Sequence, residues 1–373
     1  MEGARSLVLL KLIVAWRVAS GFDVSPASEF EVSLVETVFA SDGKTSDEFG
    51  RAVAVFEERI VIGAYNEEES TGAAYVFNST DFSQIAKLTP VGESDDDCFG
   101  CALAIYGETI VVGAAYSIQG EEEEVVTGAA FVFDATYAQI AKLTAKDGGE
   151  DDEFGWCVAI HNDTIVVGAP GHESKTGAAY VFVRRNGQYV RVAKLTANDG
   201  RETDLFGYSC AVYEDKIVVG AYEAGAAYVF NETYAQVEKL LASDAPEDGS
   251  YFGRSVAIYA DTIVVGAYGE LTTTGAAYVF NGSYVQIAKL RATDGVEDDY
   301  FGRNVAIYDD VIVVGTESAD DDLGEAGAAY VFGCNGTSSS YVQLAKLSED
   351  GNNLDDDFGL YVAIYEDQIV TRA

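Results

Sequence analysis

The sequence has few basic residues, and this shortage excludes several kinds of partner. It carries 23 Lys and Arg against 62 Asp and Glu in 373 residues, so its formal net charge is −39. Non-specific nucleic-acid binding is excluded because it requires cations that neutralise phosphates, and adhesion to anionic membranes is disfavoured. Apolar residues make up 48% of the chain, which is enough for a core and excludes a disordered acidic tail.

Cysteine and histidine are also scarce. The five cysteines are too few and too scattered to predict a disulfide framework. Cys98 and Cys101 form a C-x-x-C, but no second pair or histidine cluster completes a zinc site. The only two histidines, His161 and His172, do not recur, and the chain has no nucleophile elbow, phosphate-binding glycine loop or metalloprotease motif. The sequence therefore favours a protein that is not an enzyme.

Long hydrophobic runs are missing except near the N-terminus. Residues 7–16 are mostly apolar, Arg5 precedes them, and the small residues Val18, Ala19 and Ser20 follow. This pattern predicts a secretory signal peptide at residues 1–20 and a short lead-in at 21–31. A terminal β-strand and a mis-assigned start codon are the alternatives. No stretch reaches the ~18 apolar residues of a membrane span, so no transmembrane segment is predicted.

Most of the sequence consists of one repeated unit. Its consensus is FGxxVAIYxDxIVVGA, a variable stretch, TGAAYVF, a short turn, YxQIAKL and an acidic segment. Because a large aromatic can wedge between sheets and glycine permits close backbone approach, we assign the Phe-Gly pairs to the core. The pairs, 46 to 57 residues apart, are Phe49-Gly50, Phe99-Gly100, Phe154-Gly155, Phe206-Gly207, Phe252-Gly253, Phe301-Gly302 and Phe358-Gly359.

Each unit supplies four short runs rich in β-branched and aromatic residues, bounded by turn residues. Four antiparallel strands in each unit of this length are typical of a propeller blade. We therefore predict an all-β, seven-bladed β-propeller over residues 32–373, closed by an N-terminal outer strand at 32–39. The C-terminus provides only the first two strands of the last blade, which is expected to be incomplete. Either this blade has three strands, or the sequence is truncated or comes from a faulty gene model.

The repeated FG, VVGA and GAAYVF segments resemble the FG-GAP repeats of the N-terminal β-propeller of integrin α-subunits. The resemblance covers the chain from about residue 32 onward, and it implies an extracellular recognition module with seven blades. Integrin repeats often bind calcium through a DxDxDG segment between the first two strands. That connection has only two residues here, so the integrin calcium site does not carry over.

Acidic residues gather in the segments before each Phe-Gly pair. These segments hold 27 acidic residues, and the connections between second and third strands hold 15 more. Because connections between antiparallel strands alternate between the two faces, both kinds share one face, where 42 of the 62 acidic residues are expected. Hard cations bring such oxygens together, and a calcium site in each loop is one hypothesis. Solvated acidic turns are the alternative, because Asp-Gly is a common turn pair. The candidate ligands are Asp42, Asp47, Asp147, Asp151, Asp152, Asp199, Asp204, Asp244, Asp248, Asp294, Asp298, Asp299, Asp350, Asp355 and Asp356.

Asn-x-Ser/Thr sequons fall in the turns of the opposite face. They predict a glycosylated protein whose acidic face is free for a partner, although asparagine is common in turns. The five candidate sites are Asn78, Asn162, Asn231, Asn281 and Asn335.

Two sets of cations also recur. The lysine of each AKL-type segment is expected at the outer edge, where lysine discourages pairing between sheet edges. Arginine follows Phe-Gly directly at Arg51, Arg254 and Arg303, and we expect it to pair with the acidic loops.

Three functions remain open from the sequence. The first is a secreted or cell-surface recognition or adhesion module, whose acidic and calcium-loaded face meets an extracellular protein or glycan. The second is a glycan-processing hydrolase or lyase that uses carboxylates at the propeller mouth. The third is a structural, ion-binding surface protein. We favour the first, because the acids repeat from unit to unit whereas an active site needs distinct acid and base environments.

Overall fold

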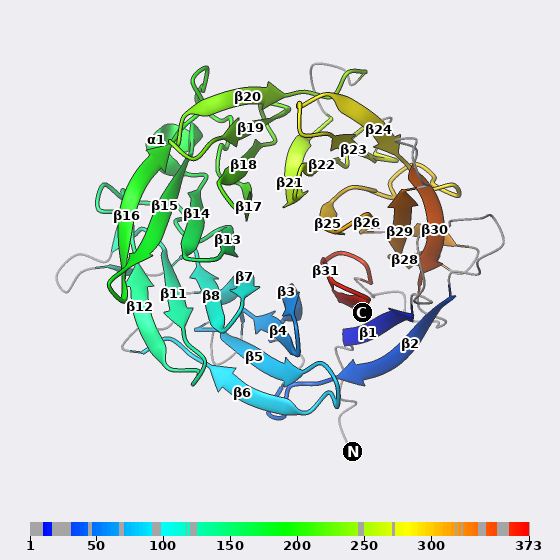
Figure 1. Cartoon of the computed structure of the whole chain (residues 1–373), viewed down its shortest axis with the longest axis horizontal. Coiled ribbons are helices and arrows are strands. Elements are labelled where there is room, and N and C mark those ends of the chain that lie inside the picture. Colours follow the sequence, from blue (N-terminus) through cyan, green and yellow to red (C-terminus); the bar gives the residue numbers. More distant parts are fainter. Residues whose placement is uncertain are drawn as a thin grey trace.

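A computed structural model of the chain describes residues 10–16, 31–43, 47–66, 71–91, 98–116, 118–119, 125–244, 250–270, 273–317, 319–321, 324–334, 341–348 and 358–372. The strands form a ring of antiparallel sheets around a central axis (Figure 1). The chain is thus an all-β propeller with four-stranded blades, as the sequence predicts. No helix among these residues is long and apolar enough to span a membrane.

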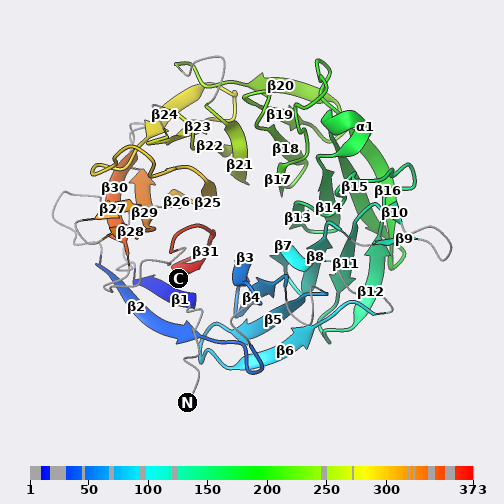
Figure 2. The ribbon, with the colours of Figure 1, turned by 180° about the vertical axis from the view of Figure 1, so that it is seen from behind.

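Six four-stranded sheets, called blades 1 to 6, each come from one continuous segment. Within each blade the strands run in sequence order from the axis to the rim (Figure 2). Their bounds are β3 (Phe49–Phe56), β4 (Arg59–Ala64), β5 (Ala73–Asn78) and β6 (Gln84–Leu88); β7 (Phe99–Tyr106), β8 (Thr109–Ala114), β11 (Ala129–Phe133) and β12 (Gln139–Leu143); β13 (Val158–His161), β14 (Thr164–Ala169), β15 (Ala178–Arg185) and β16 (Gln188–Leu195); β17 (Ser209–Tyr213), β18 (Lys216–Ala221), β19 (Ala226–Phe230) and β20 (Gln236–Leu240); β21 (Phe252–Tyr259), β22 (Thr262–Ala267), β23 (Ala276–Phe280) and β24 (Gln286–Leu290); β25 (Asn304–Tyr308), β26 (Val311–Gly315), β29 (Ala329–Cys334) and β30 (Tyr341–Leu347).

The connections between second and third strands hold the only other elements in the described part of the chain. They are the one-turn helix α1 (His172–Lys175) and two short hairpins, β9 (Ile118–Gln119) with β10 (Val125–Val126) and β27 (Ala319–Asp321) with β28 (Gly324–Ala326).

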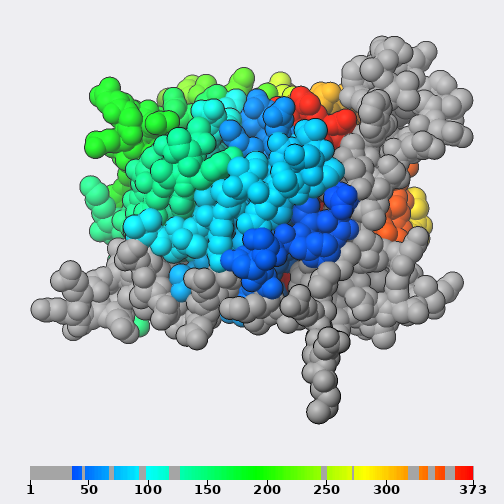
Figure 3. All heavy atoms as spheres, turned by 90° about the horizontal axis from the view of Figure 1, so that it is seen from below, coloured from blue at the N-terminus to red at the C-terminus, as the bar shows by residue number. Residues whose placement is uncertain are grey.

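A further four-stranded sheet, called the end sheet, joins the two ends of the chain in the order β2-β1-β32-β31. Its strands are β2 (Glu31–Val38), β1 (Leu10–Trp16), β32 (Gln368–Arg372) and β31 (Val362–Tyr365). The pairing of β1 with β32 brings the two ends of the described chain together. Figure 3 shows the ring edge-on, with blade 1 in blue and cyan facing the viewer. The expected outer strand at the N-terminus is therefore present, as β2.

The end sheet corrects the prediction of an incomplete last blade. Strand β1 pairs antiparallel with both β2 and β32, so it takes the third position that the sequence left vacant. This strand lies inside residues 1–20, where we predicted a signal peptide, and a terminal β-strand was the alternative. A short apolar run suits either role, because a central strand and a leader both need contiguous apolar residues.

Neighbouring blades meet through the two motifs that recur most strictly. The amide of Phe99, at the start of blade 2, donates to the carbonyl of Thr71, which precedes the third strand of blade 1, at 3.0 Å. The same bond links Phe154 to Thr127 at 3.0 Å. Gly100 has a φ of +98°, and a Cβ there would lie 2.4 Å from the carbonyl oxygen of Ala73. Phe-Gly and Thr-Gly-Ala-Ala recur together because each holds the other across a blade interface.

The phenylalanines of the Phe-Gly pairs are buried between blades, as predicted. Phe99 packs in one cluster with Val61 and Leu88 of blade 1 and with Ile110 and Phe131 of blade 2. Its ring meets that of Phe131 edge-on at 5.5 Å. Each cluster spans two sheets, so the core is a series of wedges around the ring rather than one central mass.

Candidate functional site

Backbone hydrogen bonds group the loops into two faces. The loops before the first strand and after the second strand share one face, here called the upper face; Asn66 N–H donates to the Asp47 carbonyl at 3.3 Å, and Gly171 N–H to that of Asp152 at 3.2 Å. The two kinds of tight turn share the lower face, where Ser79 N–H donates to the Glu58 carbonyl at 2.9 Å. This is the arrangement that the sequence predicted.

The first Asp of each described upper loop forms a bridge to the next sheet. Asp42, which follows β2, accepts a hydrogen bond from the Tyr75 hydroxyl at 2.9 Å and one from Lys87 Nζ at 2.8 Å, both in blade 1. The same acid–lysine pair joins Asp147 to Lys194 at 3.1 Å, Asp199 to Lys239 at 2.5 Å, Asp244 to Lys289 at 2.9 Å and Asp294 to Lys346 at 2.7 Å. The repeated lysines therefore join neighbouring sheets, a contact that their expected role at the sheet edge did not include.

These bridges keep the acids ionised. Burial raises the pKa of Asp147, but hydrogen bonds from Arg191 and Lys194 outweigh it and lower the pKa to about 2. The Lys239 ammonium likewise lowers the pKa of Asp199, and Lys289 lowers that of Asp244. Five predicted calcium ligands are thus already neutralised by lysine, which a calcium ion would have to displace.

The last Asp before Phe-Gly shapes its own loop. Asp152 and Asp299 are buried, and their Oδ2 atoms accept the amides of Gly149 at 2.8 Å and Val296 at 2.7 Å. Asp204 accepts the amide of Arg201 in the same way at 2.7 Å. These carboxylates close tight turns, which is the alternative that we gave to metal binding.

The other candidate ligands do not form a metal centre within the described ranges. Asp47 is buried, Asp151 is exposed, and Asp298 contacts the Thr273 hydroxyl. Asp248, Asp350, Asp355 and Asp356 lie outside the described residues. No three His, Cys, Asp or Glu side chains in the described part of the chain are grouped as a metal site. Calcium binding stays a prediction.

Blade 3 contains a buried polar chain that the sequence did not predict. His172 Nδ1 lies 2.6 Å from Asp152 Oδ2, and His172 Nε2 lies 2.6 Å from Lys194 Nζ. In blade 5 the buried Glu270 takes the equivalent place and accepts hydrogen bonds from Lys289 at 2.9 Å and Arg291 at 3.0 Å. Because a glutamate replaces the histidine elsewhere, we interpret this chain as a structural link.

Around the axis, the upper face carries an arc of aromatic rings. Trp156 lies 5.2 Å from Tyr208, which lies 4.5 Å from Tyr222. The arc continues through Tyr251, Tyr268 and Tyr300, with ring centroids 4.8 to 5.8 Å apart. All six rings are half-buried. The opening of the central channel at the upper face, here called the upper mouth, thus presents large, rigid side chains to solvent.

The three arginines that follow Phe-Gly stand on this aromatic surface. The Arg254 guanidinium lies 4.4 Å from the ring centroid of Tyr208, and that of Arg303 lies 5.6 Å from Tyr268. Arg51 contacts the Tyr361 hydroxyl. Among the described residues, only Arg303 pairs with an acidic loop as expected, at Glu317. Arg51 and Arg254 lie over tyrosine rings in cation–π contacts.

Below the arc, the channel holds a cavity of about 220 Å³ lined by the innermost strands of blades 1 to 6 and of the end sheet. Cys157 of blade 3 and Cys210 of blade 4 line it and form a disulfide with Cα atoms 6.1 Å apart. We did not predict this bond. The available signal was that both cysteines follow a Phe-Gly pair by two or three residues and so reach facing places in adjacent blades.

At the lower face, the last residue of each innermost strand joins a closed ring of aromatic side chains. Neighbouring ring centroids lie 4.6 to 5.1 Å apart all the way round. The ring contains Phe56, Tyr106, His161, Tyr213, Tyr259, Tyr308 and Tyr365. Tyr365 of the end sheet contacts both Tyr308 and Phe56, so that sheet completes the circle.

The lower face carries exposed carboxylates as well, so acid is not confined to the upper face. Exposed carboxylates follow every member of the aromatic ring, because each tight turn between first and second strands carries at least one. They are Glu57, Glu58, Glu108, Asp163, Glu214, Asp215, Asp261, Asp309, Asp310, Glu366 and Asp367.

The sequons of the lower face have a structural reason. In the turns between third and fourth strands, the side-chain oxygen of Asn78 accepts the amide of Thr80 at 2.7 Å, and that of Asn231 accepts the amide of Thr233 at 3.1 Å. Asn281 makes the same turn. Asp134, which cannot carry a glycan, makes it in blade 2. Asn162 lies in the other type of turn, and Asn335 lies outside the described residues.

The fold and motifs define a β-propeller of interlocking FG repeats. The FG-GAP repeat family matches residues 32–77, 82–133, 137–182, 189–230, 234–280 and 284–332, well over half of the chain. The chain therefore belongs to the FG-GAP repeat family. Each matched segment runs from the outer strand of one sheet to the third strand of the next, as β2 and β5 show for the first. No curated protein matches the chain.

Proposed function

We propose that the protein is a non-enzymatic recognition or adhesion module, secreted or at the cell surface, that contacts an extracellular protein or glycan through its upper mouth. The observation that carries this proposal is the arc of half-buried aromatic rings from Trp156 to Tyr300 with Arg254 and Arg303 standing on it. Trp, Tyr and Arg are the residues that dominate binding energy at protein interfaces. Aromatic faces of this kind also suit the apolar faces of sugars.

The extracellular location has independent support in the disulfide between Cys157 and Cys210. Such bonds form and persist in oxidising compartments and are rare in the cytosol. Glycosylation at the lower face and calcium in the acidic loops are further parts of the proposal that await measurement.

We also infer that the ring has seven blades, with the end sheet as the seventh. The closed aromatic ring supports this count, because Tyr365 contacts the neighbours on both sides. The Asp42 bridge to Lys87 also links the end sheet to blade 1 in the same way as the bridges between complete blades.

The test is binding of the purified protein to a glycan array and to a cell-surface protein fraction, with and without a calcium chelator. Arg254→Ala should weaken the binding that the wild type shows by about tenfold, which is typical for loss of one interface arginine. Arg184→Ala is the matched control, because Arg184 also lies over a tyrosine, Tyr189, at 5.9 Å, but on the lower face.

Equal binding by both variants would contradict the proposed site. Release of a cleaved product from the array would instead favour the hydrolase or lyase. Loss of binding with chelator would support calcium in the upper loops.

A further inference from the structure

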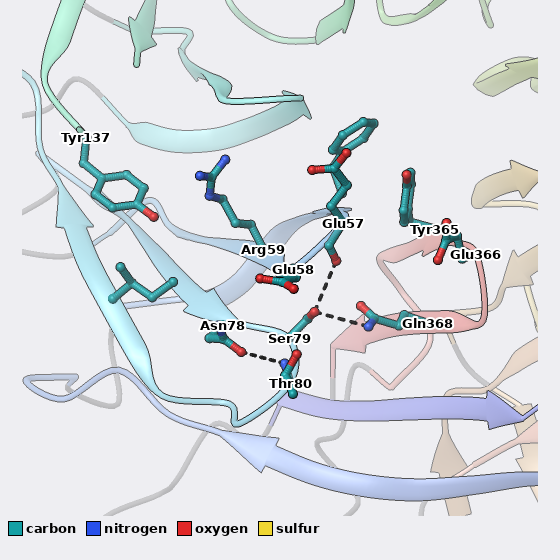
Figure 4. A pocket seen from close by; sticks show the side chains of 12 residues that line it. Glu57, Glu58, Arg59, Asn78, Ser79, Thr80, Tyr137, Tyr365, Glu366 and Gln368 are labelled. Carbon is teal, nitrogen blue, oxygen red and sulfur yellow. Dashed lines mark hydrogen bonds between the residues drawn. The ribbon is translucent and has the colours of Figure 1, made fainter. Parts of the chain in front are cut away.

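The lower face has a pocket of about 570 Å³ beside the aromatic ring. It lies where blade 1 meets the end sheet, and Tyr137 of blade 2 closes its far side (Figure 4). Two members of the ring, Phe56 and Tyr365, form its inner wall, and Ile85 contributes to the outer one. We call this cavity the lower pocket.

The charge of the lower pocket is negative. Three carboxylates line it, Glu57 and Glu58 from blade 1 and Glu366 from the end sheet, and all three residues are exposed. The one cation in its lining, Arg59, donates a hydrogen bond to the Gly107 carbonyl at 3.2 Å and is thereby tied to blade 2. The pocket thus combines aromatic faces with an excess of carboxylates.

A buried acceptor adds to this picture. Gln368 lines the pocket, and its side-chain nitrogen donates to the Ser79 hydroxyl at 3.2 Å. Its oxygen Oε1 is shielded from solvent and accepts no hydrogen bond from the described residues. Buried acceptors normally have donors, and each exception requires an explanation. A ligand that supplies N–H groups would satisfy this oxygen once the Gln368 amide turns toward the pocket.

We propose that the lower pocket binds the guanidinium group of an arginine side chain presented by a partner polypeptide. A guanidinium is planar, stacks on aromatic faces and donates two parallel hydrogen bonds to a carboxylate. It therefore matches the aromatic walls, the three glutamates and the unpaired Gln368 oxygen together, whereas an anionic or neutral partner would leave the glutamates uncompensated. This site is separate from the proposed recognition surface of the upper mouth.

The test compares two short peptides, blocked at both ends, that differ only in carrying arginine or citrulline. Citrulline has the shape of arginine without its charge. In calorimetric titrations of the full-length protein, the arginine peptide should bind at least about tenfold more tightly, since charged hydrogen bonds are lost in the citrulline peptide. Equal affinities for the two peptides would overturn the proposal, and this comparison needs no variant of the protein.

A charge-matched pair of variants locates the site. Glu57→Gln combined with Glu366→Gln should weaken arginine-peptide binding about fivefold, as expected for two solvent-exposed ion pairs. Glu214→Gln combined with Asp309→Asn removes the same charge from equivalent turns away from the pocket, so its affinity should stay within about twofold of the wild type. Equal losses of affinity in the two double variants would show that only the overall negative charge attracts the peptide. That result would overturn the proposed binding site in the lower pocket.

Discussion

The upper and lower rims of the ring hold neighbouring blades together by different means. At the upper rim, backbone meets backbone: a Cβ on Gly266 of blade 5 would lie 1.9 Å from the Gly302 carbonyl oxygen of blade 6. Lysine–aspartate bridges reinforce that rim. At the lower rim, the blades touch through side chains, the ring that includes Tyr259 and Tyr308. The glycines at the blade interface of the upper rim therefore tolerate no added atom, whereas the lower rim can change its side chains and present different surfaces.

The sharpest test of this contrast is a single methyl group at the upper rim. Gly266→Ala should lower the free energy of unfolding by about 3 kcal/mol or more, because the new Cβ overlaps a neighbouring backbone that cannot move alone. Denaturant unfolding measures it. The control is Gly149→Ala in an upper loop, where the nearest atom would be 3.5 Å away and the change should be small. Similar losses in both variants would show that the upper rim is not specially tight.

The lower rim should respond less to a larger change. Tyr259→Ala removes ring contacts of 5.1 Å with Tyr213 and 4.9 Å with Tyr308, and should cost about 2 kcal/mol in unfolding free energy. Tyr259→Phe should be nearly neutral, because Phe56 already occupies one place in the ring. If Tyr259→Ala lowers the free energy of unfolding more than Gly266→Ala does, the lower rim is the more sensitive of the two, which would contradict the proposed contrast.

The bridges of the upper rim should give a smaller effect that depends on pH. The pKa of Asp147 is lowered to about 2 in the folded protein, so its contribution to stability is present above pH 4 and disappears as the pH falls toward 2. The carboxylate is 40% exposed, so this contribution should stay below about 1 kcal/mol.

Asp147→Asn should therefore be less stable than the wild type at pH 7 and equally stable near pH 2, measured as thermal midpoints. Glu202→Gln is the control, since this exposed loop residue forms no ion pair with the described residues. A gap between Asp147→Asn and the wild type that persists at pH 2 would assign the loss to packing rather than charge.

The contrast between rims also explains what the sequence could predict. Phe-Gly and Thr-Gly-Ala-Ala recur because the blade interface requires them, so the repeat was sufficient to predict the propeller and its two faces. The bridge from Asp42 to Lys87 was missed because it joins different sheets, and spacing within a unit does not reveal which residues of neighbouring sheets meet. The sequence did contain a signal for the lower aromatic ring, because an aromatic residue ends each segment of the VAIY type. One position in each unit does not show, however, that these side chains contact one another.

The sequence did not predict the pairing of strand β1 for a related reason. Residues Leu10–Trp16 lack the Gly-Ala-Ala motif that marks the third strand of every complete blade. Their place is fixed by pairing with β32 and β2, which lie at opposite ends of the chain. Without that pairing, composition alone favours a signal peptide.

The smallest effect concerns the lower turns and separates their structural role from glycosylation. Asn231→Asp keeps the oxygen that accepts the amides of Thr233 and Ala235, both at 3.1 Å, and Asp134 already makes this turn in blade 2. The unfolding free energy should change by less than about 0.5 kcal/mol. An N-linked glycan is attached through the other atom of the same amide, so the variant must lose any glycan at this position.

Mass spectrometry of protein from a glycosylating host measures this directly. A mass reduced by one glycan, with stability unchanged, would show that the sequon carries a sugar on the lower face. An unchanged mass together with unchanged stability would show that the Asn-x-Thr pattern exists for the turn alone. In that case the lower rim is open beside Asn231, and the difference between the two faces at this position rests on backbone packing and not on sugars.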